Sequence, residues 1–142
     1  MAGSTPFVSS QVVHWDMLDL LGMLHNAQYV LLFERARFEL LSALGGSPGA
    51  SDFDWPYVVA RHEINYFQPL RIEQRVTVTI SVDRIGNSSI ALRHTLINSQ
   101  GVPSAECITT LVRIDSITLR PTPWSDKFRA LVSQYIVDAK VT

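Results

Sequence analysis

The sequence predicts an α+β fold in which a curled antiparallel sheet of about five strands wraps around one long central helix, followed by a short C-terminal helix. Two observations predict this fold. Apolar residues recur at three- and four-residue spacing over residues 27–44, as in an amphipathic helix. The segments on either side are rich in β-branched residues and are separated by turn signals. The apolar face of a single helix has to be buried, and the sheet is the element against which it can pack.

The central helix is predicted to run over residues 27–44 with Asn26 as its N-cap. Two stripes lie along it: an apolar one of Tyr29, Leu32, Phe33, Ala36, Leu40, Ala43 and Leu44, and a mixed one of Val30, Glu34, Arg37 and Leu41. We therefore expect burial around more than half of the helix. Glu34 and Arg37 are three residues apart, which favours an intrahelical ion pair. Glycines end the helix, and GGSPGASDFD is predicted to be a surface loop.

The strands are predicted from alternation and turn residues. We expect strands over residues 7–15, 55–67, 72–85, 89–98 and 102–115, of which the last four are predicted to form an antiparallel meander. Gly86-Asn87 and the segment NSQG mark two of the turns. Residues 124–137 have a weaker apolar periodicity and a possible cap in Ser125, which predicts the short C-terminal helix.

Length and composition limit the class of protein. The 142 residues fit one domain, residues 1–142. A hydrophobic fraction of 46% with 18% charged residues predicts a homo-oligomer, either dimer or tetramer. The net charge of -1 argues against nucleic acid and membrane partners. Cys107 has no partner for an internal disulfide, and no signal peptide or bilayer-spanning stretch is visible, so a cytoplasmic protein is expected.

One segment resembles a known family. The run VVHWDMLDLLGMLHNAQYVLLFERARFELLSALG resembles the first strand, loop and central helix of the 4-hydroxybenzoyl-CoA thioesterase family of acyl-CoA thioesterases. The matching positions are Trp15, Asp19, Gly22, His25-Asn26, Tyr29 and Glu34-Arg35-Ala36-Arg37. The later strands are similar too, including the turn at Pro69 and the IGNSS hairpin, so the resemblance covers residues 7–120 and leaves residues 121–142 as C-terminal helix and tail.

The resemblance implies a hotdog fold and hydrolysis of an acyl-CoA or acyl-carrier-protein thioester to a free acid and a thiol, with no cofactor. The sequence also departs from the family pattern at one position. Met17 stands where many family members place the catalytic Asp, and a thioether neither attacks a carbonyl nor deprotonates water. Asp19, and after it Asp16, are the candidates for the missing carboxylate. The alternative role of Asp19 is to brace or cap the loop.

The other candidate site residues lie at the predicted helix start. His25 either orients or deprotonates a water or is a surface loop histidine, and Asn26 either positions water and the carbonyl or only caps the helix. Tyr29, Arg37, Met17 and Gly22 are candidates for substrate binding. Tyr29 can equally belong to the core, and Arg37 to the ion pair with Glu34. In hotdog thioesterases that lack the acidic residue, polar, Arg and Tyr side chains near the helix support catalysis instead. The resemblance therefore implies this catalytic role as the alternative for Tyr29 and Arg37.

Three functions compete. The first is an acyl-CoA thioesterase, and the second is a non-catalytic hotdog dimer that binds acyl thioesters or has a structural role, which Met17 favours. A dehydratase or hydratase is disfavoured because its His and acidic pair is not found. No spacing of His or Cys suggests a metal site. Arg61, Arg84, Arg93 and Arg113 are available on strands for the CoA phosphates, although solvated strands normally carry arginines.

Overall fold

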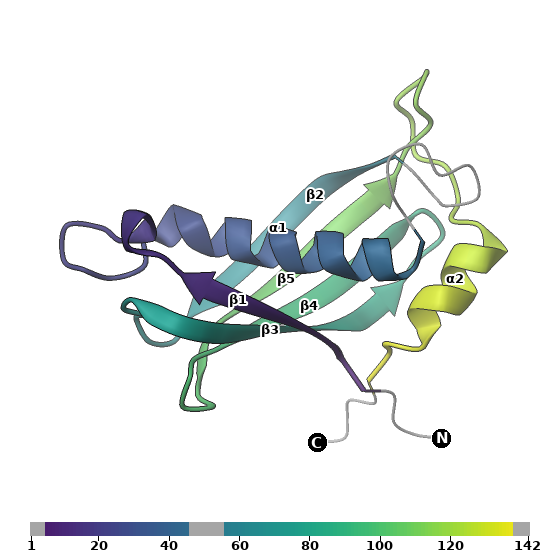
Figure 1. Cartoon of the computed structure of the whole chain (residues 1–142). Coiled ribbons are helices and arrows are strands. Elements are labelled where there is room, and N and C mark those ends of the chain that lie inside the picture. Colours follow the sequence, from purple (N-terminus) through teal and green to yellow (C-terminus); the bar gives the residue numbers. More distant parts are fainter. Residues whose placement is uncertain (1–4, 46–55, 138–142) are drawn as a thin grey trace.

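A computed structural model describes residues 5–45 and 56–137 of the chain. Most of the predicted loop GGSPGASDFD lies outside these ranges. The elements in chain order are β1 (Phe7–Val13), a 3-10 helix η1 (Trp15–Met17), α1 (Asn26–Ala43), β2 (Tyr57–Tyr66), β3 (Glu73–Ile85), β4 (Ser89–Ile97), β5 (Pro103–Arg113) and α2 (Asp126–Ser133). Figure 1 shows α1 lying across one face of the sheet, which confirms the predicted hotdog arrangement.

The five strands form one antiparallel sheet in the order β1-β3-β4-β5-β2. The predicted meander is confirmed for β3, β4 and β5 but is wrong for β2, which pairs with β5 at the far edge instead of with β3. The segment between β2 and β3, residues 67–72, carries the chain back across the sheet, and we call it the crossover. Leu70 is buried in this segment, and its carbonyl accepts a hydrogen bond from the Leu24 backbone at 2.6 Å. Docking of the crossover against the β1–α1 loop therefore replaces the expected hairpin.

Helix α1 is the centre of the core. Its buried residues are Tyr29, Leu32, Phe33, Ala36, Arg37, Leu40 and Leu41, so both predicted stripes contribute and the expected burial is confirmed. The prediction that Asn26 is the N-cap is wrong. His25 has the extended backbone of a cap, and its Nδ1 accepts a hydrogen bond from the Ala27 N–H at 3.1 Å. Asn26 is the first helical residue, because the histidine ring supplies the acceptor that an Asn side chain was expected to provide.

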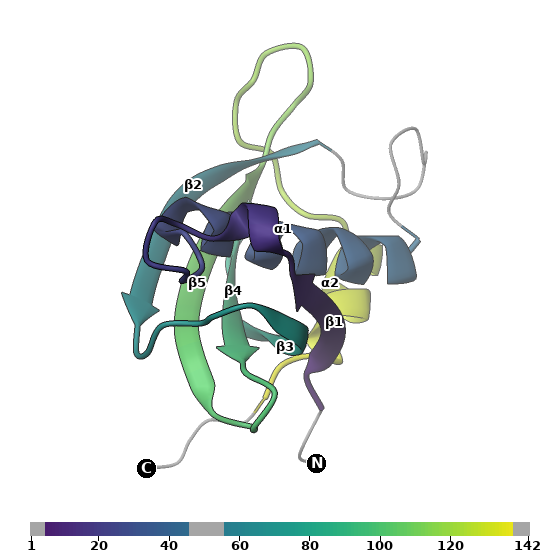
Figure 2. The same cartoon turned by 60° about the vertical axis from the view of Figure 1, so that its left-hand side comes forward.

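Helix α2 covers the end of the core beyond the C-terminus of α1 (Figures 1 and 2). Its N-cap is Ser125, as predicted, with Oγ accepting from the Phe128 N–H at 3.0 Å. The Phe128 ring stacks on Trp124 at 4.3 Å between centroids, and both side chains are buried. No helix in residues 5–45 or 56–137 is long and apolar enough to cross a membrane.

Replacing Phe33 by Ala tests how much the helix contributes to the core. The Phe33 side chain is fully buried. Its loss removes apolar contacts and leaves a cavity, so Phe33→Ala should lower the free energy of unfolding by about 3–5 kcal/mol in urea titrations. Phe38→Ala on the same helix is the control, because Phe38 is 52% exposed and should cost much less. Equal losses for the two variants would contradict the described orientation of α1.

His94 provides a pH test of the same core. The ring is fully buried, and burial, together with the nearby charge of Arg37, lowers the pKa of His94 from 6.5 to about 3. The unfolded state therefore binds more protons between these values. The contribution of neutral His94 to stability is fully present above about pH 6.5 and is lost as the pH falls toward 3, by up to about 5 kcal/mol.

Urea titrations from pH 7 to pH 4 measure this loss. His94→Gln should flatten the acid side of the stability profile relative to the unmodified protein. His14→Gln is the matched control, because His14 is exposed, and its profile should keep the original slope. An unchanged slope in His94→Gln would show that other groups cause the acid sensitivity.

Candidate functional site

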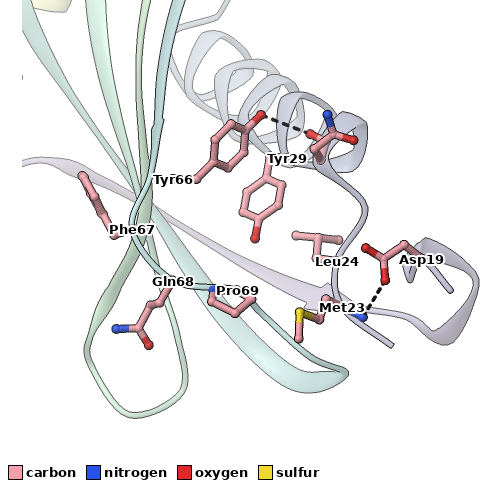
Figure 3. Close-up of a pocket in the computed structure, with 9 residues that line it drawn as sticks. Asp19, Met23, Leu24, Tyr29, Tyr66, Phe67, Gln68 and Pro69 are labelled. Atoms are coloured by element: carbon pink, nitrogen blue, oxygen red, sulfur yellow. Dashed lines mark hydrogen bonds between the residues drawn. The ribbon is translucent and has the colours of Figure 1, made fainter. Parts of the chain in front are cut away.

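A cavity of about 430 Å³ opens where the N-terminus of α1 meets the end of β2. We call it the cleft. Its walls are formed by Asp19, Met23, Leu24, Asn26, Tyr29, Tyr66, Phe67, Gln68 and Pro69 (Figure 3). The cleft thus joins the β1–α1 loop, the first turn of α1 and the crossover after β2. Three of the sequence-predicted site residues, Asp19, Asn26 and Tyr29, lie together on its wall.

Asp19 belongs to a tight loop that is closed by a bridge between Leu18 and Leu24. Its Oδ1 accepts hydrogen bonds from the N–H groups of Leu21 at 2.9 Å and Met23 at 3.1 Å. The bracing role that the sequence left open for Asp19 is therefore present. Both bonds end on Oδ1, so Oδ2 is the oxygen available to a water or a ligand in the cleft.

Gly22 makes the turn of this loop possible. Its φ of 76° lies in the left-handed region, which a residue with a side chain adopts only at a cost. Its N–H donates to the Asp19 carbonyl at 3.0 Å. Gly22 does not line the cleft, so the structure gives it a part in shaping the loop that carries Asp19.

His25 lies beside the cleft, on a second hollow that it shares with Leu18, Asp19, Leu20 and Leu21. Because its Nδ1 accepts the capping hydrogen bond, neutral His25 carries its proton on Nε2. The ring can therefore donate a hydrogen bond from Nε2 while it caps α1. It can act as a base only by giving up the cap.

Tyr29 and Tyr66 form an aromatic part of the cleft wall. The two rings meet edge to face with centroids 5.0 Å apart, and the Tyr66 hydroxyl donates to the Asn26 carbonyl at 3.4 Å. Burial raises the pKa of Tyr29, a shift that a hydrogen bond with the Leu70 backbone partly opposes. Tyr29 is therefore a neutral phenol at physiological pH. Both expected roles of Tyr29 are compatible with its position, since its side chain is buried in the core and also borders the cleft.

Two predicted substrate-binding residues lie away from the cleft. Met17 is buried in the hydrophobic core, and its sulfur accepts a hydrogen bond from the His14 N–H at 3.3 Å. Arg37 is also buried, two helical turns beyond Tyr29. The expected ion pair between Arg37 and Glu34 is wrong. No contact within 4.0 Å joins these two described side chains, and Arg37 instead hydrogen-bonds the Tyr57 side chain.

Sequence patterns did not identify the wall that follows β2. They place Tyr66, Phe67 and Gln68 in a strand and at its end, and only Pro69 stands out as a turn. The usable signal is the break in the strand pattern between Tyr66 and Leu70, where two aromatic rings precede a proline. None of the arginines considered for CoA phosphates lines the cleft.

Two of those arginines are engaged by carboxylates. Arg93 contacts Asp83 at 3.1 Å and Glu106 at 3.0 Å, and Arg61 contacts Glu63 at 3.6 Å. In the part of the chain that the structure describes, no group of three or more His, Cys, Asp or Glu side chains is placed to hold a metal ion.

Comparison with known proteins adds a family match. The model of the thioesterase-like superfamily matches residues 12–132. The chain is 23% identical over 110 residues to the acyl-CoA thioester hydrolase YbgC of Escherichia coli O157:H7, a match that covers 77% of this chain and 82% of YbgC. YbgC of Shigella flexneri matches equally well.

Solved structures are similar as well. A predicted thioesterase from Bacillus stearothermophilus superimposes with a TM-score of 0.84 at 25% identity, over 96% of this chain and 100% of the other. A thioesterase from Thermus thermophilus, complexed with coenzyme A and Zn, superimposes with a TM-score of 0.77 at 26% identity, over 88% and 90%. A third, SAV2348 from Staphylococcus aureus in complex with CoA, shares the fold with a TM-score of 0.87 at 18% identity, over 100% of this chain and 90% of the other.

Proposed function

Because the chain belongs to the thioesterase-like superfamily, we propose that it hydrolyses acyl-CoA thioesters, or the equivalent carrier-protein thioesters, in the cleft at the start of α1. The observation that carries the proposal is the Asp19 carboxylate on the cleft wall, beside the positive end of the α1 dipole. A carboxylate and a preorganised set of N–H donors are what hydrolysis of a thioester requires. The coenzyme A complex of the similar thioesterase from Thermus thermophilus agrees with a CoA substrate.

In the proposed reaction Asp19 is the general base. Its Oδ2 takes a proton from a water as the water oxygen bonds to the thioester carbon, and the carbonyl oxygen gains the negative charge. Collapse of this intermediate breaks the C–S bond, and the thiolate takes the proton back from Asp19. The products are a free acid and a thiol, so atoms and charges balance without a cofactor.

Asn26 and His25 complete the proposed site. The N–H of Ala27 is taken by His25 Nδ1 and that of Gln28 by the His25 carbonyl at 2.8 Å, which leaves the Asn26 N–H and side-chain amide as donors at the helix start. We assign them to the developing oxyanion and the attacking water. His25 Nε2–H is a further donor from the neighbouring hollow. Tyr29, as a neutral phenol, forms an apolar part of the cleft wall.

A second function is favoured by one observation. Met17 is buried among core residues where many relatives of the 4-hydroxybenzoyl-CoA thioesterase type carry a catalytic Asp, so no carboxylate acts from that position. If Asp19 does not replace it, the protein binds acyl thioesters without hydrolysing them. The two functions differ in one measurable product, the free thiol.

Asp19→Asn tests the role of the carboxylate. The amide oxygen still accepts the two loop hydrogen bonds, whereas proton abstraction is lost, so kcat for release of CoA thiol should fall by about 100- to 10,000-fold with the fold retained. The readout is thiol release from a panel of acyl-CoAs. Asp16→Asn is the matched control, because Asp16 is exposed and lines neither hollow, and it should behave like the unmodified protein.

The two possible failures of this experiment have different meanings. An unchanged rate in Asp19→Asn would remove Asp19 from the mechanism but leave the hydrolase in place. If the unmodified protein releases no thiol from any acyl-CoA yet binds CoA, the non-hydrolytic function is correct.

We also propose that the single domain works in the cytoplasm as a homo-oligomer, a dimer or a tetramer, assembled through β2. β2 is an edge strand with apolar side chains at the surface, including Val58 at 44% and Val59 at 42% exposure. Unpaired edge strands of this kind are normally covered. The cleft borders the same strand through Tyr66, so a second copy on β2 would lie next to the site.

Val59→Asp tests this assembly. A charge on the β2 edge should shift the oligomer toward monomer, because the interface would have to bury an unpaired carboxylate. Sedimentation velocity at several protein concentrations measures the shift. Val8→Asp is the control on the opposite edge strand β1, where Val8 is 60% exposed, and it should leave the mass unchanged. The reverse pattern would place the interface on β1.

A further inference from the structure

The sheet carries a group of polar side chains that the proposed reaction does not use. We call it the polar cluster, and it consists of Arg37 from α1, Tyr57 and His62 from β2, His94 from β4, and Cys107 and Thr109 from β5. Hydrogen bonds connect several of its members. His62 Nδ1 lies 3.0 Å from Thr109 Oγ1, Cys107 Sγ lies 3.3 Å from the same oxygen, and Arg37 bonds the Tyr57 side chain.

Arg37 is the unusual member of the cluster. Its side chain is 2% exposed, and its Nε and Nη1 have no hydrogen-bond partner among the described residues. The carboxylate of Glu34 acts on its charge from a distance but is not in ion-pair contact. The buried His94 Nε2 is likewise without a partner in the described part of the chain. A buried cation with free donors and no paired counter-charge is costly, unless an anion joins it when the protein acts.

The position of Arg37 relates it to the cleft. Tyr29, Phe33 and Arg37 follow one another at four-residue intervals along α1, and all three side chains are buried. Eight residues of helix separate Tyr29 from Arg37, which corresponds to about 12 Å along the axis. β2 runs alongside, with Tyr66 on the cleft wall and His62 four residues away in the polar cluster.

The polar cluster also reaches the surface. His62 is exposed and Tyr57 is half-buried, so two members of the cluster on β2 are accessible from the surface. An acyl chain that starts at a thioester in the cleft and follows α1 for two helical turns would bring its far end to the level of Arg37.

We propose that Arg37 recognises the distal end of the acyl group, and that the preferred substrates are acyl thioesters whose chain ends in a carboxylate. The inference rests on the proposed thioesterase function and adds a substrate class to it. A carboxylate supplies the charge and the acceptor oxygens that the Arg37 guanidinium lacks. The reacting thioester stays in the cleft, so the chemistry is unchanged.

The test compares matched substrates in the full-length protein. Straight-chain acyl-CoAs and their ω-carboxy counterparts, of about eight to twelve carbons to span about 12 Å, are assayed for thiol release. The unmodified protein should show a ratio of kcat/KM, ω-carboxy over alkyl, of about tenfold or more. Arg37→Met should bring this ratio to one or below. A buried charge without a partner often tolerates an apolar replacement, so this variant should fold.

Arg75→Met is the matched control. Arg75 is exposed and donates to Ser10 at 2.9 Å, on the other edge of the sheet from β2, so its loss should leave the ratio unchanged. Arg37→Gln is a second variant that keeps hydrogen-bonding capacity but removes the charge, and it should lower the ratio as well. Circular dichroism of each variant confirms that the fold is retained.

Calorimetry separates the inference from the proposed function. It uses thioether analogues of the same acyl-CoAs, which cannot be hydrolysed. Tighter binding of the ω-carboxy analogue that depends on Arg37 supports the inference even if no thiol is released. Equal binding and equal turnover of the two substrate series would overturn it and leave the thioesterase function standing. A ratio that survives both Arg37 variants would also overturn it.

Discussion

Burial of α1 against the inward face of the sheet is the constraint on which the rest of the structure depends. The helix presents two buried stripes, and only a sheet that curls past both sides of it covers them. The curl puts β1 at one edge and β2 at the other (Figure 2). It also fixes the helix start against the end of β2, which is where the cleft forms. The position of the candidate site is therefore set by core packing.

The loop before α1 is held by polar contacts that the core does not provide. Asp19 closes the turn with its side chain, and the Leu24 N–H bonds the Leu70 carbonyl of the crossover. A loop anchored in this way holds a carboxylate in a fixed place beside the helix dipole. Preorganisation of this kind matters for hydrolysis, because the charge in the transition state then needs no rearrangement of the protein. The polar bracing and the proposed chemistry use the same side chain.

Local patterns predicted most of the elements. The spacing along α1 identified the buried stripes, and the alternation of β3 and the turn at Gly86 identified the strands that follow one another. Non-local features were beyond such patterns. The pairing of β2 with β5 is accompanied by burial of Leu70 in the crossover, and the cap at His25 is decided by the geometry of one ring nitrogen.

The candidate site was predicted only in part, because local patterns find its residues near the helix start but not those that come from distant parts of the chain. Asp19, Asn26 and Tyr29 are close in sequence and in space, so the family resemblance found them together. The wall from Tyr66 to Pro69 consists of the last residue of β2 and the start of the crossover, and Tyr66 is 40 residues along the chain from Asn26, so its place depends on the sheet order. Arg37 matched the family pattern, but only the structure shows that it is buried without a paired counter-charge.

The placement of β2 at the edge has a consequence for how the protein folds. Strands β3, β4 and β5 are joined by short turns and can pair early, whereas β2 pairs with β5 only across the 39 positions that separate Tyr66 from Ala105. The Tyr66 wall of the cleft is complete only after that closure. The β3–β5 part of the sheet can thus form before the cleft, and a mutation that slows closure of β2 would delay completion of the cleft more than it delays pairing of these three strands.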